Sequence, residues 1–296
     1  MFNLTGGAPE AEKLFARAAT LLGGRDPREF VDTEDSNAVH HNYAGQILCC
    51  LQPLAAIEAL RAVLPKRLIV AGYSVGEVAA WGVAGFLSPM DILDVVSRRA
   101  RVMDAASPAG DGMLFIRGLS RALIDGLCER YHAEIAIISP ADAFVLGGNA
   151  RELTAVGEEA MKAGASRVVA LPVEVASHTA RLSGASAEFR TYLKASFPTP
   201  TISTGVRLLS GIDGSPVMDG VSGLEKLAAQ ISQTVRWDAC LQGCVEGGAT
   251  AFLELGPGSA LRGMAGEANP NIASRSLDDF RTLDGVRSWI AKHADN

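Results

Sequence analysis

The hydrophobic and polar positions of the chain follow two alternating patterns, one typical of helices and one typical of short buried strands. Apolar residues recur every three or four positions between Ala11 and Leu22, which predicts a helix that ends at Gly23-Gly24. After a polar stretch, a long apolar helix is expected from about 46 to 64, where Pro65 stops it. The other elements expected before residue 112 are a strand over 68–71 and helices over 75–86 and 89–105.

The pattern changes from Met113 onward, where shorter elements follow one another. We expect strands over 113–117, 134–138, 144–146 and 167–172, with helices over 121–131 and 151–163. The order β-α-β-β-α-β is that of a ferredoxin-like unit. The main pattern then resumes with helices over 182–197, 224–235 and 237–246, strands over 207–210 and 252–255, and a C-terminal helix from about 285.

These patterns predict an α/β protein with two parts. A main α/β-hydrolase-like domain is expected to comprise 1–112 and 174–296, and a ferredoxin-like subdomain is expected to be inserted at 113–173.

Composition and charge then exclude several classes of protein. Hydrophobic residues make up 48% of the 296 residues and charged residues 20%, so the chain can bury a large core and is not disordered. A net charge of −6 without a basic run argues against nucleic acid as the main partner. No apolar run approaches the roughly 18 residues of a membrane span, and the N-terminus does not resemble a signal peptide. A cytoplasmic protein without a membrane partner is expected.

The cysteines give no sign of a metal site. All five lie on apolar helical patterns, and none is grouped with histidine at the spacing of a zinc site. We expect reduced core cysteines and no bound metal.

The strongest chemical signal is Gly72-Tyr73-Ser74-Val75-Gly76, between the strand over 68–71 and a helix. In this context Gly-x-Ser-x-Gly predicts a nucleophile elbow, a strained turn that exposes the serine hydroxyl. Gly72 and Gly76 would leave no Cβ to collide with the turn. The start of the helix directs backbone N–H groups toward a developing oxyanion. The alternative is a glycine-rich turn with a structural role only.

Ser74 needs a base, and the chain has five histidines. His178 is the best placed, because it lies where the chain leaves the insert and returns to the main domain. An α/β-hydrolase triad would instead place its histidine near the C-terminus, but His293 lies in a polar tail. We therefore favour a Ser-His dyad in which a carbonyl oxygen orients His178.

Arg99 is a second candidate. Together with Ile92, Val96 and Met103 it falls on the apolar face of its predicted helix. A buried guanidinium needs an anionic partner. The sequence leaves two alternatives, a structural ion pair or a clamp for a carboxylate of the substrate.

With these residues assembled, the chain resembles the malonyl-CoA:acyl-carrier-protein transacylase family from about Leu14 onward. The matching segments are Gly72–Glu77 (G-H-S-x-G-E in the family), Arg99 with Met103 (R-x-x-x-M), Val175–His178 (V-P-S-H or x-A-x-H), Gln230 before Trp237, Glu254–Gly258 (E-x-G-P-G) and Gln46 (Q-P-A-L). The resemblance implies the α/β-hydrolase-like fold with a ferredoxin-like insert.

The resemblance also implies a ping-pong acyl transfer. His178 would take the proton of Ser74, which attacks malonyl-CoA, and the phosphopantetheine-type thiol of an acyl carrier protein would then accept the malonyl group. Arg99 would hold the malonyl carboxylate, the Val75 N–H would donate to the oxyanion, and the main-chain carbonyl of Gln230 would orient His178. No tightly bound cofactor is implied.

The sequence departs from the family pattern in two places. Tyr73 replaces the usual histidine, and with Val75, Val78, Trp81 and the tail 276–286 it resembles the transacylase (epsilon) subunit of malonate decarboxylase, which loads a dedicated carrier subunit. The family's first strand and its G-Q-G-x-Q loop, the source of a second oxyanion donor, have no counterpart except a weak Gly6-Gly7. The strand over 68–71 should therefore be poorly covered on one side.

Three functions remain open at this level. The first is a malonyl transacylase of a malonate decarboxylase system, with fatty-acid synthesis as the near variant. The second is a catalytically weak subunit that docks a carrier protein. The third is a hydrolase that uses the same elbow with water.

Overall fold

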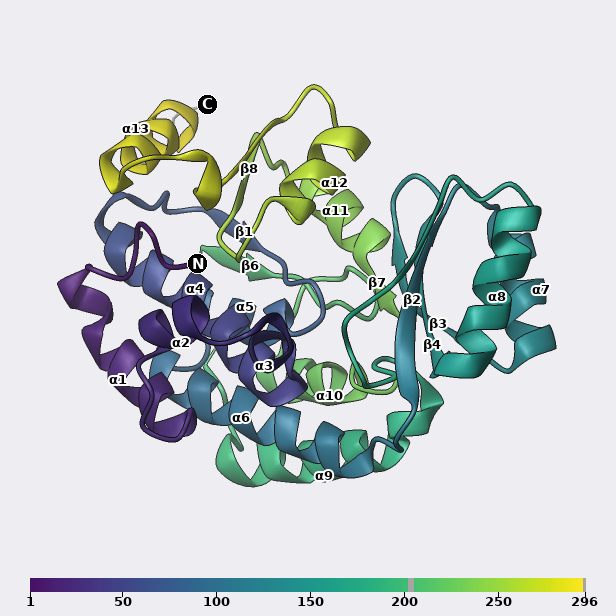
Figure 1. Ribbon diagram of the computed structural model, residues 1–296. Coiled ribbons are helices and arrows are strands. Elements are labelled where there is room, and N and C mark those ends of the chain that lie inside the picture. The colour runs from purple at the N-terminus through teal and green to yellow at the C-terminus, as the bar shows by residue number, and fades with distance from the viewer. Residues whose placement is uncertain (202–204, 295–296) are drawn as a thin grey trace.

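The computed structural model describes residues 1–201 and 205–294, and it shows two parts joined side by side (Figure 1). The larger part is mainly helical and contains both ends of the chain. The smaller part, on the right of Figure 1, is a sheet with two helices on its outer face. The predicted main segment 174–296 includes 202–204 and 295–296, which lie outside the described residues.

The helices of the larger part cover two short pairs of strands. They are α1 (Glu12–Leu21), α2 (Pro27–Thr33), α3 (Ser36–His40), α4 (Asn42–Leu60), α5 (Gly76–Val83), α6 (Pro89–Ala106), α9 (Ser183–Ser196), α10 (Gly220–Ala229), α11 (Trp237–Glu246), α12 (Ala260–Ala268) and α13 (Leu283–Ala294). Short 3₁₀ turns at Pro9–Ala11, Arg61–Val63, Ala180–Leu182 and Leu277–Asp279 complete this part.

Helix α4 is the centre of the core. It packs against α1, α5 and α6, and most of its side chains are fully buried. The segment Asn42–Val63 is long and apolar enough to cross a membrane, although the sequence had suggested no such run. Because 72% of its most apolar window is buried inside the protein, its hydrophobicity is explained by the core.

The strands of the larger part form two separate parallel pairs instead of one continuous sheet. β1 (Leu68–Val70) pairs with β6 (Val206–Leu208), and β8 (Ala251–Glu254) pairs with β9 (Ala273–Ser276). Among the described residues β1 has no partner on its other edge, and all three of its residues are partly exposed. This agrees with the expectation of a poorly covered strand.

The smaller part has the predicted order β-α-β-β-α-β. Its elements are β2 (Asp111–Arg117), α7 (Arg121–Tyr131), β3 (Glu134–Ser139), β4 (Ala143–Asn149), α8 (Ala150–Lys162) and β5 (Arg167–Ala170). The sheet order is β5-β2-β4-β3, with β2, β4, β3 and β5 paired antiparallel. A fifth strand, β7 (Val235–Arg236), comes from the larger part and pairs parallel with β3, so the two parts share one sheet.

The bounds predicted for the helix over 224–235 are wrong at both ends. Helix α10 begins at Gly220, after an N-cap in which the Asp219 side chain accepts from two backbone N–H groups, and it ends at Ala229. Pairing with β3 then extends the chain at Val235, and Thr234 donates to the carbonyl of Ile135 at 2.7 Å. Tertiary pairing here overrides the helical pattern of the sequence.

Four further elements were missed. The polar stretch 25–42 contains α2 and α3, whose N-caps are Asp26 and Asp35. Helix α12 and strand β9 were not expected either, because α12 buries only Ala265 and β9 is mostly exposed. Such elements have little apolar periodicity to reveal them.

Candidate active site

Ser74 lies in a sharp turn between β1 and α5. Its φ angle of 52° is in the left-handed region, which is uncommon for a residue with a side chain. The N–H of Gly76 donates to the Tyr73 carbonyl at 2.8 Å, and the N–H of Glu77 donates to the Ser74 carbonyl at 3.0 Å. These bonds close the turn in the strained geometry of a nucleophile elbow.

The two glycines of the elbow are not equivalent. A Cβ on Gly72 would lie 2.1 Å from the carbonyl carbon of Gly76, so only glycine fits there. A Cβ on Gly76 would meet nothing within 4 Å. The expectation that both glycines avoid a collision therefore holds for Gly72 and is wrong for Gly76.

Ser74 and His178 form a hydrogen-bonded pair. Ser74 Oγ lies 2.7 Å from His178 Nε2, and His178 Nδ1 lies 2.5 Å from the main-chain oxygen of Gln230. A carbonyl oxygen can only accept, so Nδ1 carries the proton and the Nε2 lone pair faces the serine hydroxyl. The pair has the geometry of a nucleophile with its general base, oriented by a carbonyl.

The backbone holds His178 in an unusual conformation. Its φ angle is 62°, and its N–H donates to the Ile231 carbonyl at 2.8 Å. Nearby, Thr179 Oγ1 donates to the Ala176 carbonyl at 2.7 Å. Ile231, the residue after Gln230, thus fixes the backbone of His178. The turn that follows α10 therefore sets both the position and the tautomer of the imidazole ring.

His178 is neutral at physiological pH. Burial lowers its pKa to about 3, and the positive charge of Arg99 acts in the same direction, while the hydrogen bond to Gln230 opposes both. Its side chain is almost wholly buried. A neutral imidazole is the form that can accept the Ser74 proton.

Arg99 is buried, and no carboxylate of the described residues pairs with it. The predicted apolar face of α6 is confirmed, since Ile92, Val96, Arg99 and Met103 are all buried. Arg99 Nη1 donates to Gln46 Oε1 at 2.6 Å and Nη2 donates to Gln230 Oε1 at 3.2 Å.

The structural ion pair considered for Arg99 is absent from the described part of the chain. Its Nε has no hydrogen-bond partner there, whereas Arg98, on another face of α6, pairs with Glu188. Burial lowers the pKa of Arg99 to about 10, which still leaves it charged at pH 7. A buried guanidinium held by two amide oxygens is suited to bind an anion.

Two contributions to the site were not predicted from the sequence. The side-chain amide of Gln230 donates to the Ser74 carbonyl at 3.2 Å and to Glu77 Oε2, in addition to accepting from Arg99. Glu77 is fully buried, and burial raises its pKa to about 7. A charged residue directly after an elbow glycine, in an otherwise apolar turn of helix, was the available signal.

The backbone N–H groups at the start of α5 are the candidate donors to an oxyanion. The N–H groups of Gly76 and Glu77 are used within the turn, which leaves that of Val75 as the first at the start of α5. A Cβ on Gly6 would meet Phe2 and Arg28, and Gly7 has open space around it. Nothing in these contacts links Gly6-Gly7 to Ser74.

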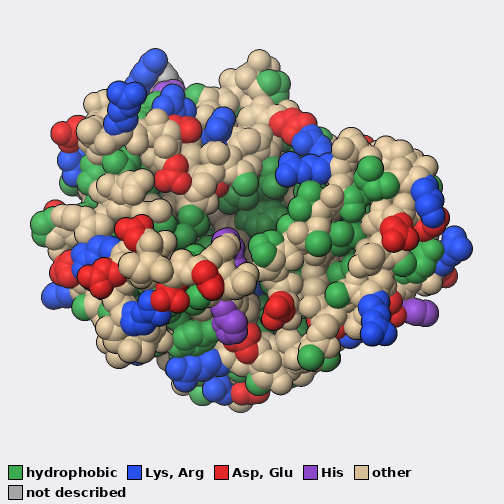
Figure 2. Space-filling model, in the orientation of Figure 1, with side chains coloured by type: hydrophobic (Ala, Val, Ile, Leu, Met, Phe, Trp, Pro, Cys, Tyr) green, Lys and Arg blue, Asp and Glu red, His purple; other side chains and the backbone are tan. Residues whose placement is uncertain are grey.

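The surface near the join of the two parts is hollowed and apolar. Figure 2 shows this hollow at the centre of the face, lined with hydrophobic side chains. The apolar cluster that joins the parts includes Tyr73, whose ring packs edge-on against Trp237 with centroids 5.6 Å apart. Burial raises the pKa of Tyr73 to about 12, so its phenol stays neutral.

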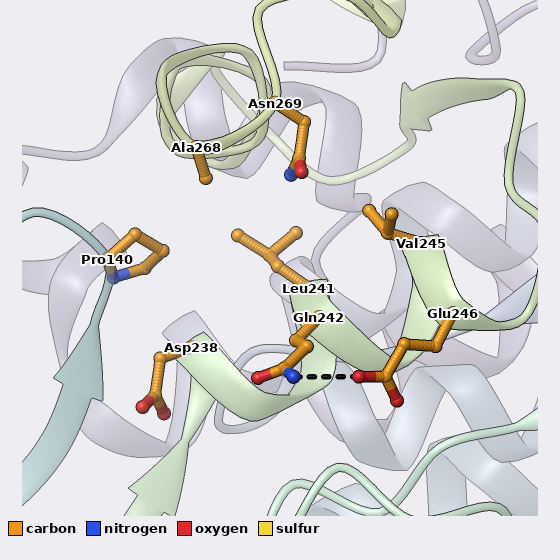
Figure 3. Close-up of a pocket in the computed structure, with 8 residues that line it drawn as sticks. All are labelled: Pro140, Asp238, Leu241, Gln242, Val245, Glu246, Ala268 and Asn269. Carbon is orange, nitrogen blue, oxygen red and sulfur yellow. Dashed lines mark hydrogen bonds between the residues drawn. The ribbon is translucent and has the colours of Figure 1, made fainter.

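A separate cavity of about 400 Å³ does not contain the dyad. It lies between α11, α12 and the turn after β3 (Figure 3), and its lining residues are Pro140, Asp238, Leu241, Gln242, Val245, Glu246, Ala268 and Asn269. Gln242 donates to Glu246 at 2.7 Å across its floor. Its two carboxylates do not suit an anionic acyl group.

Residues 1–201 and 205–294 contain no cluster of three or more histidine, cysteine, aspartate or glutamate residues that could hold a metal ion. All five cysteines are free thiols.

The strained elbow, the Ser74–His178 pair and the buried Arg99 are arranged as expected for an acyl transferase. The family model described as acyl transferase domain matches residues 32–274, and the chain belongs to this family.

Similar proteins extend this match over nearly the whole chain. A malonyl CoA-acyl carrier protein transacylase of Bacillus subtilis is 24% identical over 294 residues, 97% of this chain and 92% of that protein. One of Salmonella typhimurium is 28% identical over 290 residues, 94% of this chain and 91% of that protein. The crystal structure of an acyl-carrier-protein S-malonyltransferase from Burkholderia pseudomallei matches with a TM-score of 0.86 and 26% identity, covering 97% of this chain and 94% of that one.

Proposed function

We propose that the protein transfers a malonyl group from malonyl-CoA, through a malonyl ester of Ser74, to the phosphopantetheine-type thiol of an acyl carrier protein. The observation that carries this proposal is Arg99, a buried cation that lies beside a Ser-His pair and has no carboxylate partner among the described residues. An acyl group with a free carboxylate supplies the missing anion. The names of the relatives support the same reaction.

The proposed reaction has two half-reactions. His178 Nε2 takes the Ser74 proton while Oγ attacks the thioester carbon, the Val75 N–H stabilises the oxyanion, and CoA leaves as the thiol after receiving a proton from His178. The carrier thiol then gives its proton to His178 and attacks the ester, and Ser74 recovers its proton. Arg99 holds the malonyl carboxylate throughout, and the Gln230 carbonyl keeps the imidazole oriented.

We further propose that the carrier belongs to a malonate decarboxylase system. Support comes from Tyr73, Val75, Val78 and Trp81 in the elbow segment and from the tail 276–286. Fatty-acid synthesis is the alternative. Parallel transfer assays with a decarboxylase carrier subunit and a fatty-acid carrier protein separate the two, since the preferred carrier should react with the higher kcat/KM.

A second candidate function is a carrier-docking subunit with weak catalysis. The observation in its favour is that the N–H groups of Gly76 and Glu77 donate within the elbow turn, which leaves Val75 as the candidate oxyanion donor at the start of α5. Loss of one such donor typically slows a reaction about 10²–10³-fold.

Intact-mass measurement after mixing with malonyl-CoA tests the proposal. A stable malonyl adduct that is lost in Ser74→Ala supports transfer, and His178→Ala should slow its formation roughly 10²–10⁴-fold. Carrier binding without any adduct would favour the docking subunit. Rapid release of free malonate without an added thiol would favour a hydrolase.

We propose an α/β-hydrolase-like domain from 1–112 and 174–296, a ferredoxin-like subdomain at 113–173, and a cytoplasmic location. The element order of the insert and its sheet order β5-β2-β4-β3 support the subdomain.

A further inference from the structure

Glu77 is a buried carboxylate beside the active site that no step of the proposed transfer uses. It lies three residues after Ser74, in the first turn of α5, with 0% of its surface exposed. Its Oε2 accepts from the N–H of Gly211 at 3.0 Å and from the side-chain amide of Gln230. Its other oxygen has no partner within the described structure. Burial of a carboxylate with one unpaired oxygen costs free energy, so a functional reason for Glu77 is expected.

Both the nitrogen and the oxygen of the Gln230 side-chain amide form hydrogen bonds. Its nitrogen donates to Glu77 and, at 3.2 Å, to the Ser74 carbonyl, while its oxygen accepts from Arg99 at 3.2 Å. A flipped amide would direct N–H groups at the guanidinium and place its oxygen against two other oxygens. The Glu77 acceptor therefore decides which end of the amide faces Arg99.

We propose that Glu77 is a positioning residue for substrate selection, which fixes the Gln230 amide so that Arg99 is held ready for the carboxylate of the acyl group. The inference rests on the proposed function and deepens it. Glu77 does not contact the substrate, and it acts through Gln230.

The separation of the two charges explains why this arrangement suits a binding site. A direct Glu77–Arg99 ion pair would occupy the donors that a substrate carboxylate needs. With Gln230 between them, Glu77 occupies none of the guanidinium donors, and Arg99 Nε makes no hydrogen bond with the described residues. Burial raises the pKa of Glu77 and lowers that of Arg99, and the attraction between the two charges opposes both shifts.

Two variants of Glu77 separate positioning from general stability. Glu77→Gln keeps an oxygen that can accept from both Gly211 and Gln230, whereas Glu77→Leu removes the acceptor. The readout is the ratio of acyl-enzyme formation rates with malonyl-CoA and acetyl-CoA, because acetyl has no carboxylate for Arg99. Glu77→Leu should lower this ratio at least about 10-fold, the equivalent of one hydrogen bond to a charged group. Glu77→Gln should keep the ratio within about threefold.

Matched variants complete the experiment. Glu254 is also a buried carboxylate that accepts two backbone N–H groups, those of Leu261 and Arg262, so Glu254→Leu should lower stability without changing the ratio. If Glu77→Leu does not fold, Gln230→Met removes the same amide and keeps the main-chain carbonyl for His178, and it should lower the ratio equally.

The outcomes separate a failure of the positioning role of Glu77 from a failure of the proposed malonyl transfer. Equal loss of both rates in Glu77→Leu with an unchanged ratio, or a Gln230→Met ratio equal to that of the wild type, overturns the positioning role. A loss in Glu77→Gln as large as in Glu77→Leu overturns it too. A wild-type protein that prefers acetyl-CoA, or in which Arg99→Ala leaves the ratio unchanged, contradicts the proposed function itself.

Discussion

His178 and Gln230 are joined by a hydrogen bond of 2.5 Å between the imidazole Nδ1 and a main-chain oxygen. The side chain of the same glutamine reaches Arg99 and the Ser74 carbonyl. One residue at the end of α10 therefore contacts His178, Ser74 and Arg99, which are the proposed base, nucleophile and anion-binding group. Small movements of this turn should affect all three.

Arg99→Ala should remove the preference for malonyl-CoA over acetyl-CoA. The lost charged hydrogen bonds correspond to roughly 3 kcal/mol, or about 10² in the ratio of kcat/KM values. Arg101→Ala is the control, because Arg101 lies on the exposed face of the same helix over the ring of Tyr43. A ratio that survives in Arg99→Ala would show that another group binds the carboxylate.

The two glycines of the elbow should respond differently to alanine. Gly72→Ala forces a Cβ into the backbone of Gly76 and should cost roughly 2–3 kcal/mol of unfolding free energy with loss of adduct formation. Gly76→Ala meets open space in the first turn of a helix and should be neutral or stabilising by up to about 1 kcal/mol. Urea denaturation and intact mass measure both effects. Equal damage from the two substitutions would contradict the steric account.

The rate of Ser74 acylation should not show the pH dependence of an ordinary histidine. Because burial lowers the pKa of His178 to about 3, the ring stays neutral at pH 5–8 and the base remains available. The rate of malonyl adduct formation should therefore show no fall centred near pH 6.5. Glu77→Gln is measured in parallel, since Glu77 titrates in this window and its removal leaves His178 as the group observed. A half-maximal rate near pH 6.5 in both proteins would refute a deeply buried neutral base.

Glu77 should make the protein less stable as pH rises. Its pKa is about 7 when folded and its ordinary value is 4.5, so the folded state binds more protons between these values. The stabilisation is fully present below pH 4.5 and is lost as pH rises through 7. Glu77→Gln cannot titrate, so its unfolding free energy relative to the wild type should rise over pH 5–7, by on the order of 1 kcal/mol per pH unit.

Urea melts at several pH values measure this difference directly. His178 is present in both proteins, and its own effect has the opposite sign, because its lowered pKa makes the folded state bind fewer protons between pH 3 and 6.5. Comparison of the two proteins cancels the histidine contribution. A difference that does not change with pH would mean that Glu77 keeps an ordinary pKa.

The sequence by itself determined the features that depend on near neighbours. The elbow at Ser74 follows from a strand, a tight turn and a helix within a few residues. Arg99 faces the core because helical spacing places it with Ile92, Val96 and Met103. The order of elements in the insert was also predictable, since each has its own apolar period and turn residues.

Only the tertiary structure decided how distant segments meet. Gln230 accepts a hydrogen bond from Arg99, 131 positions away, and donates one to Glu77, 153 positions away. The orienting group of His178 is a carbonyl that every residue possesses. The early end of α10 results from pairing of β7 with a strand of the insert. The division of the main strands into two pairs likewise depends on long-range pairing. Local sequence patterns do not predict such contacts, because the free energy of these contacts comes from surfaces that meet only when the whole chain has folded.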